Sequence, residues 1–149
     1  MLEVTEHIAI ERPVTVVEAQ FGDVAHHERS GVHRGVQFVV VDETAEYCVY
    51  EQITRLGPAK LRQSFRLERD DPARQVNVII AGAFRGGSIT FDIAPDREAD
   101  VTLVSATLRA PVRGITAWLA PVLRRALSRS LSKALAEDRR DLESGSYLA

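Results

Sequence analysis

The chain has 149 residues, of which 45% are hydrophobic and 27% charged, and its formal net charge at pH 7 is −2. This composition is typical of a globular protein and excludes a long disordered chain, so we expect one domain over residues 1–149. No apolar run reaches the ~20 residues that a membrane-spanning helix needs. We therefore predict a cytoplasmic protein without membrane insertion. The arginines of the last third are not interleaved with aromatic residues, which argues against a nucleic-acid partner.

The N-terminal segment begins with a strand pattern and then changes to a helical one. Residues 4–11 are rich in β-branched types and predict a strand that ends at Arg12-Pro13. The following VTVVEAQFGDVAHHERS has apolar residues at helical spacing but is interrupted by Gly22-Asp23. This segment therefore predicts two short helices, with Asp23 as the N-cap of the second.

From residue 36 onward the apolar residues recur at every second position. Six strand-like runs follow one another, at 36–42, 46–55, 59–69, 74–84, 87–95 and 100–110. The short turns between them predict an antiparallel meander, and the alternation predicts one apolar face and one solvated face.

The last segment has the period of an amphipathic helix, which we expect from Ile115 to Leu142. Leucines recur along one stripe, and a sheet with one apolar face must be covered. We therefore predict an α+β helix-grip fold, in which a curved antiparallel seven-stranded sheet, two short helices and the long C-terminal helix enclose a mainly apolar cavity.

The order of these elements, the opening IERPVTVVEAQFGDV and the terminal helix resemble the START-like or Bet v 1-like (SRPBCC) helix-grip superfamily, which includes polyketide cyclases and lipid-transfer domains. The resemblance covers essentially the whole chain. It implies a small hydrophobic or aromatic ligand in the cavity, which is either carried or converted by cyclase- or dehydratase-type chemistry.

Several strand residues are candidates for contact with such a ligand. Gln63 is the polar member of an otherwise apolar strand face, and Tyr50 and Glu51 point to opposite faces, so that only one of the two can lie inside. A hydrogen-bonded structural role is the alternative for each polar candidate. The aromatic residues Phe38 and Trp118 are expected in the core. The candidate ligand-binding residues are Tyr50, Glu51, Gln63, Phe65, Phe91 and Ser105.

The stretch DVAHHERSGVHRG holds three of the four histidines. Asp23 and His26 have the spacing found in the catalytic domain of Rieske non-haem iron oxygenases, and the later AEDRRDLES resembles the segment of that family with the carboxylate ligand, here Asp138. The resemblance implies Fe(II) bound by His26, His33 and Asp138, with His27 as the alternative ligand to His26. His33 follows one or two residues later than in the family. A break at Ser30-Gly31 is needed, since seven residues of straight helix span about 10 Å.

Asp138 has support from the helical pattern itself. It lies three residues after Leu135 and four before Leu142, within the apolar stripe, where a carboxylate is costly unless it is paired, hydrogen-bonded or bound to a metal. Two histidines and one carboxylate form the facial triad of non-haem Fe(II) sites. The alternative is that the histidines line a polar loop at the cavity mouth and that Asp138 pairs with Arg34, Arg139 or a backbone amide.

Three functional hypotheses follow. The first is binding of a small apolar or aromatic ligand, with or without cyclase- or dehydratase-type catalysis. The second is an iron-dependent oxygenase-like protein, which would need a separate redox partner because the single cysteine, Cys48, excludes a Rieske cluster in this chain. The third is an interaction module that uses the fold without a ligand.

Overall fold

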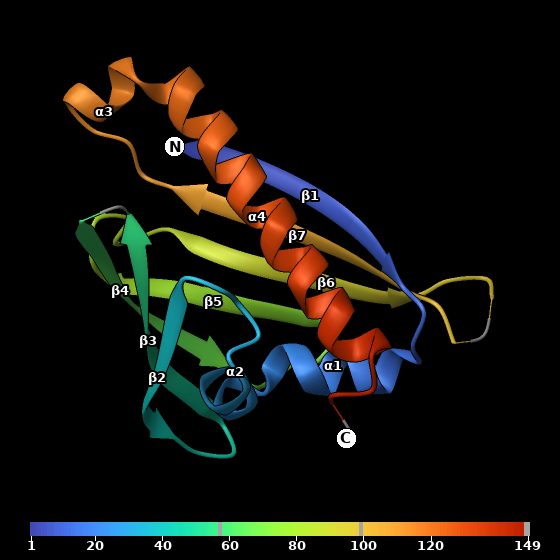
Figure 1. Cartoon of the computed structure of the whole chain (residues 1–149). Helices are drawn as coiled ribbons and strands as arrows, with labels where there is room; N and C mark the ends of the chain where they lie inside the picture. Colours follow the sequence, from blue (N-terminus) through green and yellow to red (C-terminus); the bar gives the residue numbers. More distant parts are fainter. Residues whose placement is uncertain (57, 99, 148–149) are drawn as a thin grey trace.

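The computed structural model describes residues 1–56, 58–98 and 100–147, with the side chains of all of these except Leu56, Ile115 and Thr116. Figure 1 shows an α+β arrangement in which helices cover one face of a single curved sheet. The elements in chain order are β1 (Leu2–Ile10), α1 (Val14–Gly22), α2 (Val24–Ser30), β2 (Val36–Glu43), β3 (Tyr47–Leu56), β4 (Ala59–Glu68), β5 (Arg74–Ala81), β6 (Ser88–Pro95), β7 (Thr102–Ala110), α3 (Ile115–Trp118) and α4 (Ala120–Glu143).

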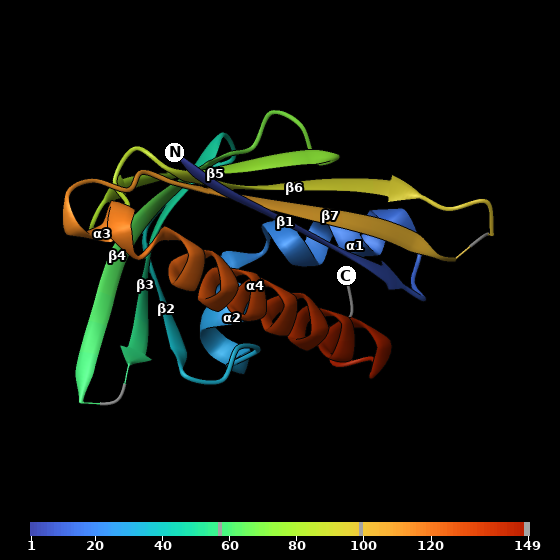
Figure 2. The same ribbon diagram turned by 90° about the horizontal axis from the view of Figure 1, so that it is seen from above.

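The seven strands form one antiparallel sheet in the order β1-β7-β6-β5-β4-β3-β2. Strands β2 to β7 follow one another as a meander, and β1 pairs with β7 at the far edge. The predicted helix-grip fold is thereby confirmed. In Figure 2, β2, β3 and β4 turn toward the side on which α4 lies, so the sheet bends around the long helix.

The long C-terminal helix begins later than the sequence predicted. The structure has a short α3, a break at Leu119 and then α4, where we expected one helix from Ile115. The physical reason is Pro121, which has no backbone N–H and whose ring would clash with the carbonyl one turn earlier in a continuous helix. Pro121 therefore stands at the start of α4.

The break also corrects the prediction for Trp118, which was expected in the core. Its side chain is 89% exposed, as the last residue of α3. Its aromatic side chain alone had placed it in the core, but Trp118 lies on the short α3, before the break at Leu119, and not on the long helix α4. In Figure 1, α3 lies beyond the N-terminal end of α4, at the opposite end of the long helix from α1.

The core consists of two clusters that leave a cavity between them. One joins α4 to α1, β1, β6 and β7 through fully buried residues such as Val17, Val104 and Leu135. The other lies on β3, β4 and β5 and includes Phe65 and the α2 residue Val24. Among the described residues no helix is both long and apolar enough to cross a membrane.

Candidate functional site

The cavity between α4 and the sheet has a volume of about 300 Å³ and is partly open to solvent. Its floor is apolar, with contributions from both core clusters, such as Phe21, Leu108 and Leu131 from one and Val24 from the other. This size lies at the lower end of the range typical of small-molecule sites.

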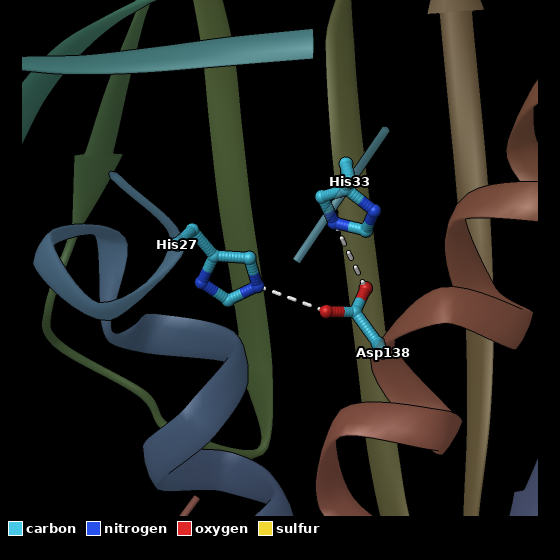
Figure 3. Close-up of side chains that lie close together, drawn as sticks. All are labelled: His27, His33 and Asp138. Carbon is cyan, nitrogen blue, oxygen red and sulfur yellow. Dashed lines mark hydrogen bonds and ion pairs between the residues drawn. The ribbon is translucent and has the colours of Figure 1, made fainter. Parts of the chain in front are cut away.

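Three ionisable side chains meet at one wall of this cavity. His27 comes from α2, His33 from the loop before β2, and Asp138 from α4, and each offers one ligand atom within 4.8 Å of the others. The Nε2 atom of His27 lies 2.9 Å from Oδ1 of Asp138, and Nε2 of His33 lies 3.4 Å from Oδ2. Figure 3 shows both rings directed at the one carboxylate.

Local backbone chemistry brings the two histidines together. Asp23 caps α2, because its Oδ1 accepts the backbone N–H of His26 at 3.0 Å, as the sequence predicted. The helix ends at Ser30, and Gly31 follows with a φ of 57°, a left-handed conformation that glycine adopts without strain. The predicted break at Ser30-Gly31 is confirmed, and it lets the chain turn back so that the ring of His33 stacks on that of His27 at 5.4 Å.

The hydrogen bonds of His27 fix the way its ring faces Asp138. Its Nδ1 lies 2.8 Å from the carbonyl oxygen of Asp23, and a carbonyl only accepts, so Nδ1 carries the proton. In the neutral ring Nε2 then has a lone pair, which would face a carboxylate oxygen at 2.9 Å. The contact is favourable only if Nε2 is also protonated or if a cation lies between the two groups.

His33 has the same arrangement on the other side of the carboxylate. Its Nδ1 lies 3.1 Å from Oε1 of Glu137, which holds the ring from behind, while Nε2 faces Asp138. The other oxygen of Glu137 accepts the backbone N–H of Arg34 at 3.1 Å. Histidines that bind metals typically donate their second N–H to a carbonyl or carboxylate in this way.

The charges of the site reinforce one another despite burial. Burial alone lowers the pKa of His33, but its hydrogen bonds and charge interactions with Asp138 and Glu137 outweigh it, and the pKa is raised above 6.5. For Asp138, burial raises the pKa, and the hydrogen bonds from His27 and His33 lower it further than burial raises it. The carboxylate, which is 3% exposed, is therefore ionised and ready to balance a positive charge.

His26 lies outside this group, so the geometry corrects the first choice of ligand and favours the alternative, His27. The Nε2 atom of His26 lies 2.8 Å from Oδ2 of Asp141, and its ring packs edge-on against Tyr147 at 4.7 Å. Successive residues of a helix point about 100° apart. One of the two adjacent histidines therefore faces the cavity and the other faces the C-terminal tail.

Asp138 has other partners than those proposed from the sequence. We considered Arg34, Arg139 or a backbone amide, but its carboxylate contacts the two histidines and accepts a hydrogen bond from Nε2 of Gln20 at 3.0 Å. The same Gln20 nitrogen also donates to Asp141 at 3.0 Å. Since both neighbours only accept, the amide orientation of this fully buried side chain is determined.

The sequence reasoning missed Gln20, although a signal was present. Gln20 lies three residues after Val17 and four after Val16 on the same helix, within an apolar helical stripe, which is the argument that supported Asp138. Glu137 and Tyr147 were also missed. Nothing in the local sequence indicates their contacts, because each depends on a partner more than 100 residues away.

Two of the predicted ligand-contacting residues line the cavity. Phe91 packs edge-on against Phe21 at 5.0 Å on its floor, and Tyr50 lies on its sheet side. The hydroxyl of Tyr50 donates to Oδ1 of Asn77 at 2.7 Å, and Asn77 also lines the cavity. Phe65 is stacked behind Tyr50 at 5.2 Å and is fully buried, outside the cavity lining.

The other three candidates lie away from the cavity wall. Glu51 alternates with the buried Tyr50 and pairs with Arg62 at 3.5 Å. The amide oxygen of Gln63 accepts the backbone N–H of Phe84 at 3.1 Å, which is a structural role in the turn after β5. Ser105 alternates with buried neighbours and bonds to Nδ1 of His7 at 2.8 Å on the opposite face of the sheet.

Solved structures with the same fold come from several bacteria. A protein from Thermus thermophilus is 19% identical, covers 96% of this chain and 99% of its own, and superimposes with a TM-score of 0.81. A START superfamily protein from Mycobacterium smegmatis is 11% identical, with 95% and 97% of the two chains covered and a TM-score of 0.76. The Zhui aromatase/cyclase from Streptomyces sp. R1128 is 15% identical, with 94% of each chain covered and a TM-score of 0.64.

No protein-family model and no curated protein sequence matches this chain. The likeness to the solved structures lies in the fold, which is that of the START-like or Bet v 1-like helix-grip proteins and of polyketide aromatase/cyclases. This is the class of fold that the order of elements in the sequence predicted.

Proposed function

We propose that this protein binds a small, mainly apolar or aromatic molecule in the cavity between α4 and the sheet. The observation that carries the proposal is the open cavity of about 300 Å³, which has an apolar floor and a cluster of ionisable groups at one wall. Such a cavity gains affinity from apolar burial and orientation from a few polar groups. Its occurrence in a fold shared with an aromatase/cyclase supports this assignment.

The same cavity suits cyclase- or dehydratase-type catalysis. His33 lines the wall, and its raised pKa keeps the ring protonated to higher pH than usual. A protonated imidazole can donate a proton to a ligand hydroxyl that leaves as water, and the neutral ring can then accept the proton lost from the neighbouring carbon as the double bond forms, which restores the protonated ring. The cavity meanwhile holds the ligand in a reactive conformation. Glu51, a candidate ligand contact from the sequence, lies outside the cavity and has no part in this proposal.

The binding proposal is tested with the neutral aromatic probe 2-naphthalenemethanol and isothermal titration calorimetry. The variant Ala134→Phe fills the cavity from α4, and the matched variant Ala126→Phe adds the same side chain to an exposed position of the same helix. We expect the wild type and Ala126→Phe to bind equally and Ala134→Phe to lose binding by at least about tenfold. Equal binding by all three proteins would refute the cavity as the site.

A second candidate function is favoured by the geometry of the histidine cluster. We propose that His27, His33 and Asp138 bind Fe(II) as a facial triad in an oxygenase-like protein that receives electrons from a separate redox partner. The donor set fits, because both Nδ1 atoms are held by oxygen acceptors and both Nε2 atoms converge on the carboxylate. Bound iron would supply open positions for oxygen and substrate on the cavity side.

Metal content after anaerobic loading with Fe(II) tests this second candidate. Elemental analysis should give near-stoichiometric iron in the wild type and almost none in the variants His27→Ala, His33→Ala and Asp138→Ala. His7→Ala removes the one histidine that lies on the far face of the sheet and should retain the metal. A wild type that retains no iron would contradict this second candidate. A wild type that binds neither the naphthalene probe nor iron would favour the third hypothesis, an interaction module without a ligand.

A further inference from the structure

Three cationic side chains line the open side of the cavity. Arg34 comes from the loop before β2, Arg55 from β3 and Lys133 from α4. All three are exposed, so they lie at the rim, around the apolar floor. Within the part of the chain that the structure describes, none of these three side chains has a hydrogen bond or an ion pair.

The acidic residues of the cavity lining do not neutralise this rim. Only Glu137 and Asp138 are acidic among the described lining residues. Glu137 lies one turn after Lys133, but its two oxygens face His33 and the backbone N–H of Arg34. Asp138 is engaged by the two histidines and by Gln20.

The acidic residue of β3 also has another partner. Glu51, which lies on β3 as Arg55 does, directs its carboxylate to Arg62 at 3.5 Å. Among the described residues, the mouth therefore has three cations without a counter-charge, in front of an apolar cavity. A negatively charged group held there would gain attraction from all three, and screening by salt would weaken it because the cations are exposed.

We propose that the ligand of this cavity is an anionic amphiphile, with an aromatic or apolar body on the floor and a carboxylate at the rim formed by Arg34, Arg55 and Lys133. This inference rests on the proposed ligand-binding function and names the class of ligand that the site selects. The site selects such a ligand because burial of its apolar body in the cavity places its carboxylate next to the cations of the rim.

The test compares 2-naphthoate with 2-naphthalenemethanol, which have the same ring system and differ in charge. Calorimetric titrations are carried out at low ionic strength with EDTA present, so that no metal can bind the carboxylate. We expect wild-type protein to bind the carboxylate at least about fivefold more tightly than the alcohol, and high salt to reduce this ratio toward one.

Two variants assign the preference to the rim. Arg55→Gln and Lys133→Gln should each lower the carboxylate affinity about two- to fivefold and leave the alcohol affinity unchanged. Arg129→Gln, which removes one positive charge from an exposed position of α4 outside the cavity lining, should change neither. Equal affinities of wild type for the two probes would overturn this inference alone, whereas failure of both probes to bind would overturn the proposed function as well.

Discussion

The two adjacent histidines of α2 belong to regions with different chemistry. His27 faces the cavity, where its ring and that of His33 converge on a single buried carboxylate. His26 faces the C-terminal tail, where it contacts Asp141 and the ring of Tyr147. Gln20 connects the two regions, since its amide nitrogen donates to both aspartates.

The difference lies in how many donors share an acceptor and in what surrounds them. In the cavity cluster two imidazole rings face one carboxylate, and the Nδ1 atom of each ring is held by an oxygen acceptor. This arrangement suits a cation or a proton shared between the rings and the carboxylate. In the tail cluster one ring has one carboxylate, and the hydroxyl of Ser30 lies 3.2 Å from its other nitrogen. The first region is therefore suited to chemistry, and the second holds Tyr147 against α2.

The largest expected effect separates the two aspartates. Asp138→Ala leaves the buried His27 and the partly buried His33 without their shared acceptor and should lower the free energy of unfolding by about 3–5 kcal/mol. Asp141→Ala removes one acceptor of His26 and should cost about 1–3 kcal/mol. Urea unfolding of both variants at neutral pH measures the difference. An equal or larger loss in Asp141→Ala would show that the tail cluster contributes more stability than the cavity cluster.

A smaller loss of stability is expected from Asp23→Ala, because Asp23 contacts the tail cluster through its side chain and the cavity cluster through its backbone. Its carboxylate caps α2 and accepts the hydroxyl of Tyr147, whereas its backbone oxygen orients His27. The substitution removes only the carboxylate and should lower the free energy of unfolding by about 1–2 kcal/mol. Iron content after anaerobic loading should persist. Loss of the iron would mean that the side chain, and not the carbonyl, holds His27 in place.

Tyr147→Phe tests the tail alone. Burial, and then the hydrogen bond to Asp23, raise the pKa of Tyr147 to about 12, so it stays a donor, at 3.0 Å from Oδ2. Its removal should cost about 0.5–1.5 kcal/mol in thermal or urea unfolding and leave binding in the cavity unchanged. Tyr47→Phe, which loses an exposed bond to Asp42, is the matched control and should cost less. A change in probe affinity would contradict the separation of the two regions.

We expect the smallest effect from pH, since burial opposes the protonation of His33. The pKa of His33 is raised above 6.5 in the folded protein. Its contribution to stability is therefore complete below pH 6.5 and is lost as pH rises through the higher pKa of the folded state. The lowered pKa of Asp138 gives a contribution that is present above 3.8 and is lost at lower pH.

His33 and Asp138 should therefore contribute most to the free energy of unfolding between about pH 4 and 6.5. Urea midpoints of metal-free protein from pH 4 to 9 measure the decline above that range. His33→Gln should flatten the decline. If the variant declines as steeply as the wild type, another group is responsible for the pH dependence.

Most of the fold was predictable because its signals are local. The change from a two-residue to a helical period located the strands and the long helix, and Gly22-Asp23 separated α1 from α2. The errors came where one local rule overrode another. Pro121 breaks the C-terminal helix, and Trp118 consequently lies outside the core.

The site was predictable in part. Asp138 was named through the resemblance of AEDRRDLES to the carboxylate segment of the oxygenases, and the rule that a carboxylate in an apolar stripe needs a partner supported it. The candidates for ligand contact were chosen by alternation along strands, which correctly placed Tyr50 and Phe91 on the cavity side of the sheet. It failed for Gln63, because the register between β4 and β5 shifts beside it and the turn at Phe84 occupies its amide.

By itself, the sequence determined the order of strands and helices, the apolar face of the sheet and the inward position of Asp138, since each follows from periodicity along the chain. Only the tertiary structure decided that His27, and not His26, faces that carboxylate. Adjacent helical residues differ by about 100°, so the choice depends on how α2 is rotated when Val24 packs against the sheet. The tertiary structure also brought Arg34, Arg55 and Lys133 to one rim, because residues so far apart in the chain meet only when the long helix closes over the bent sheet.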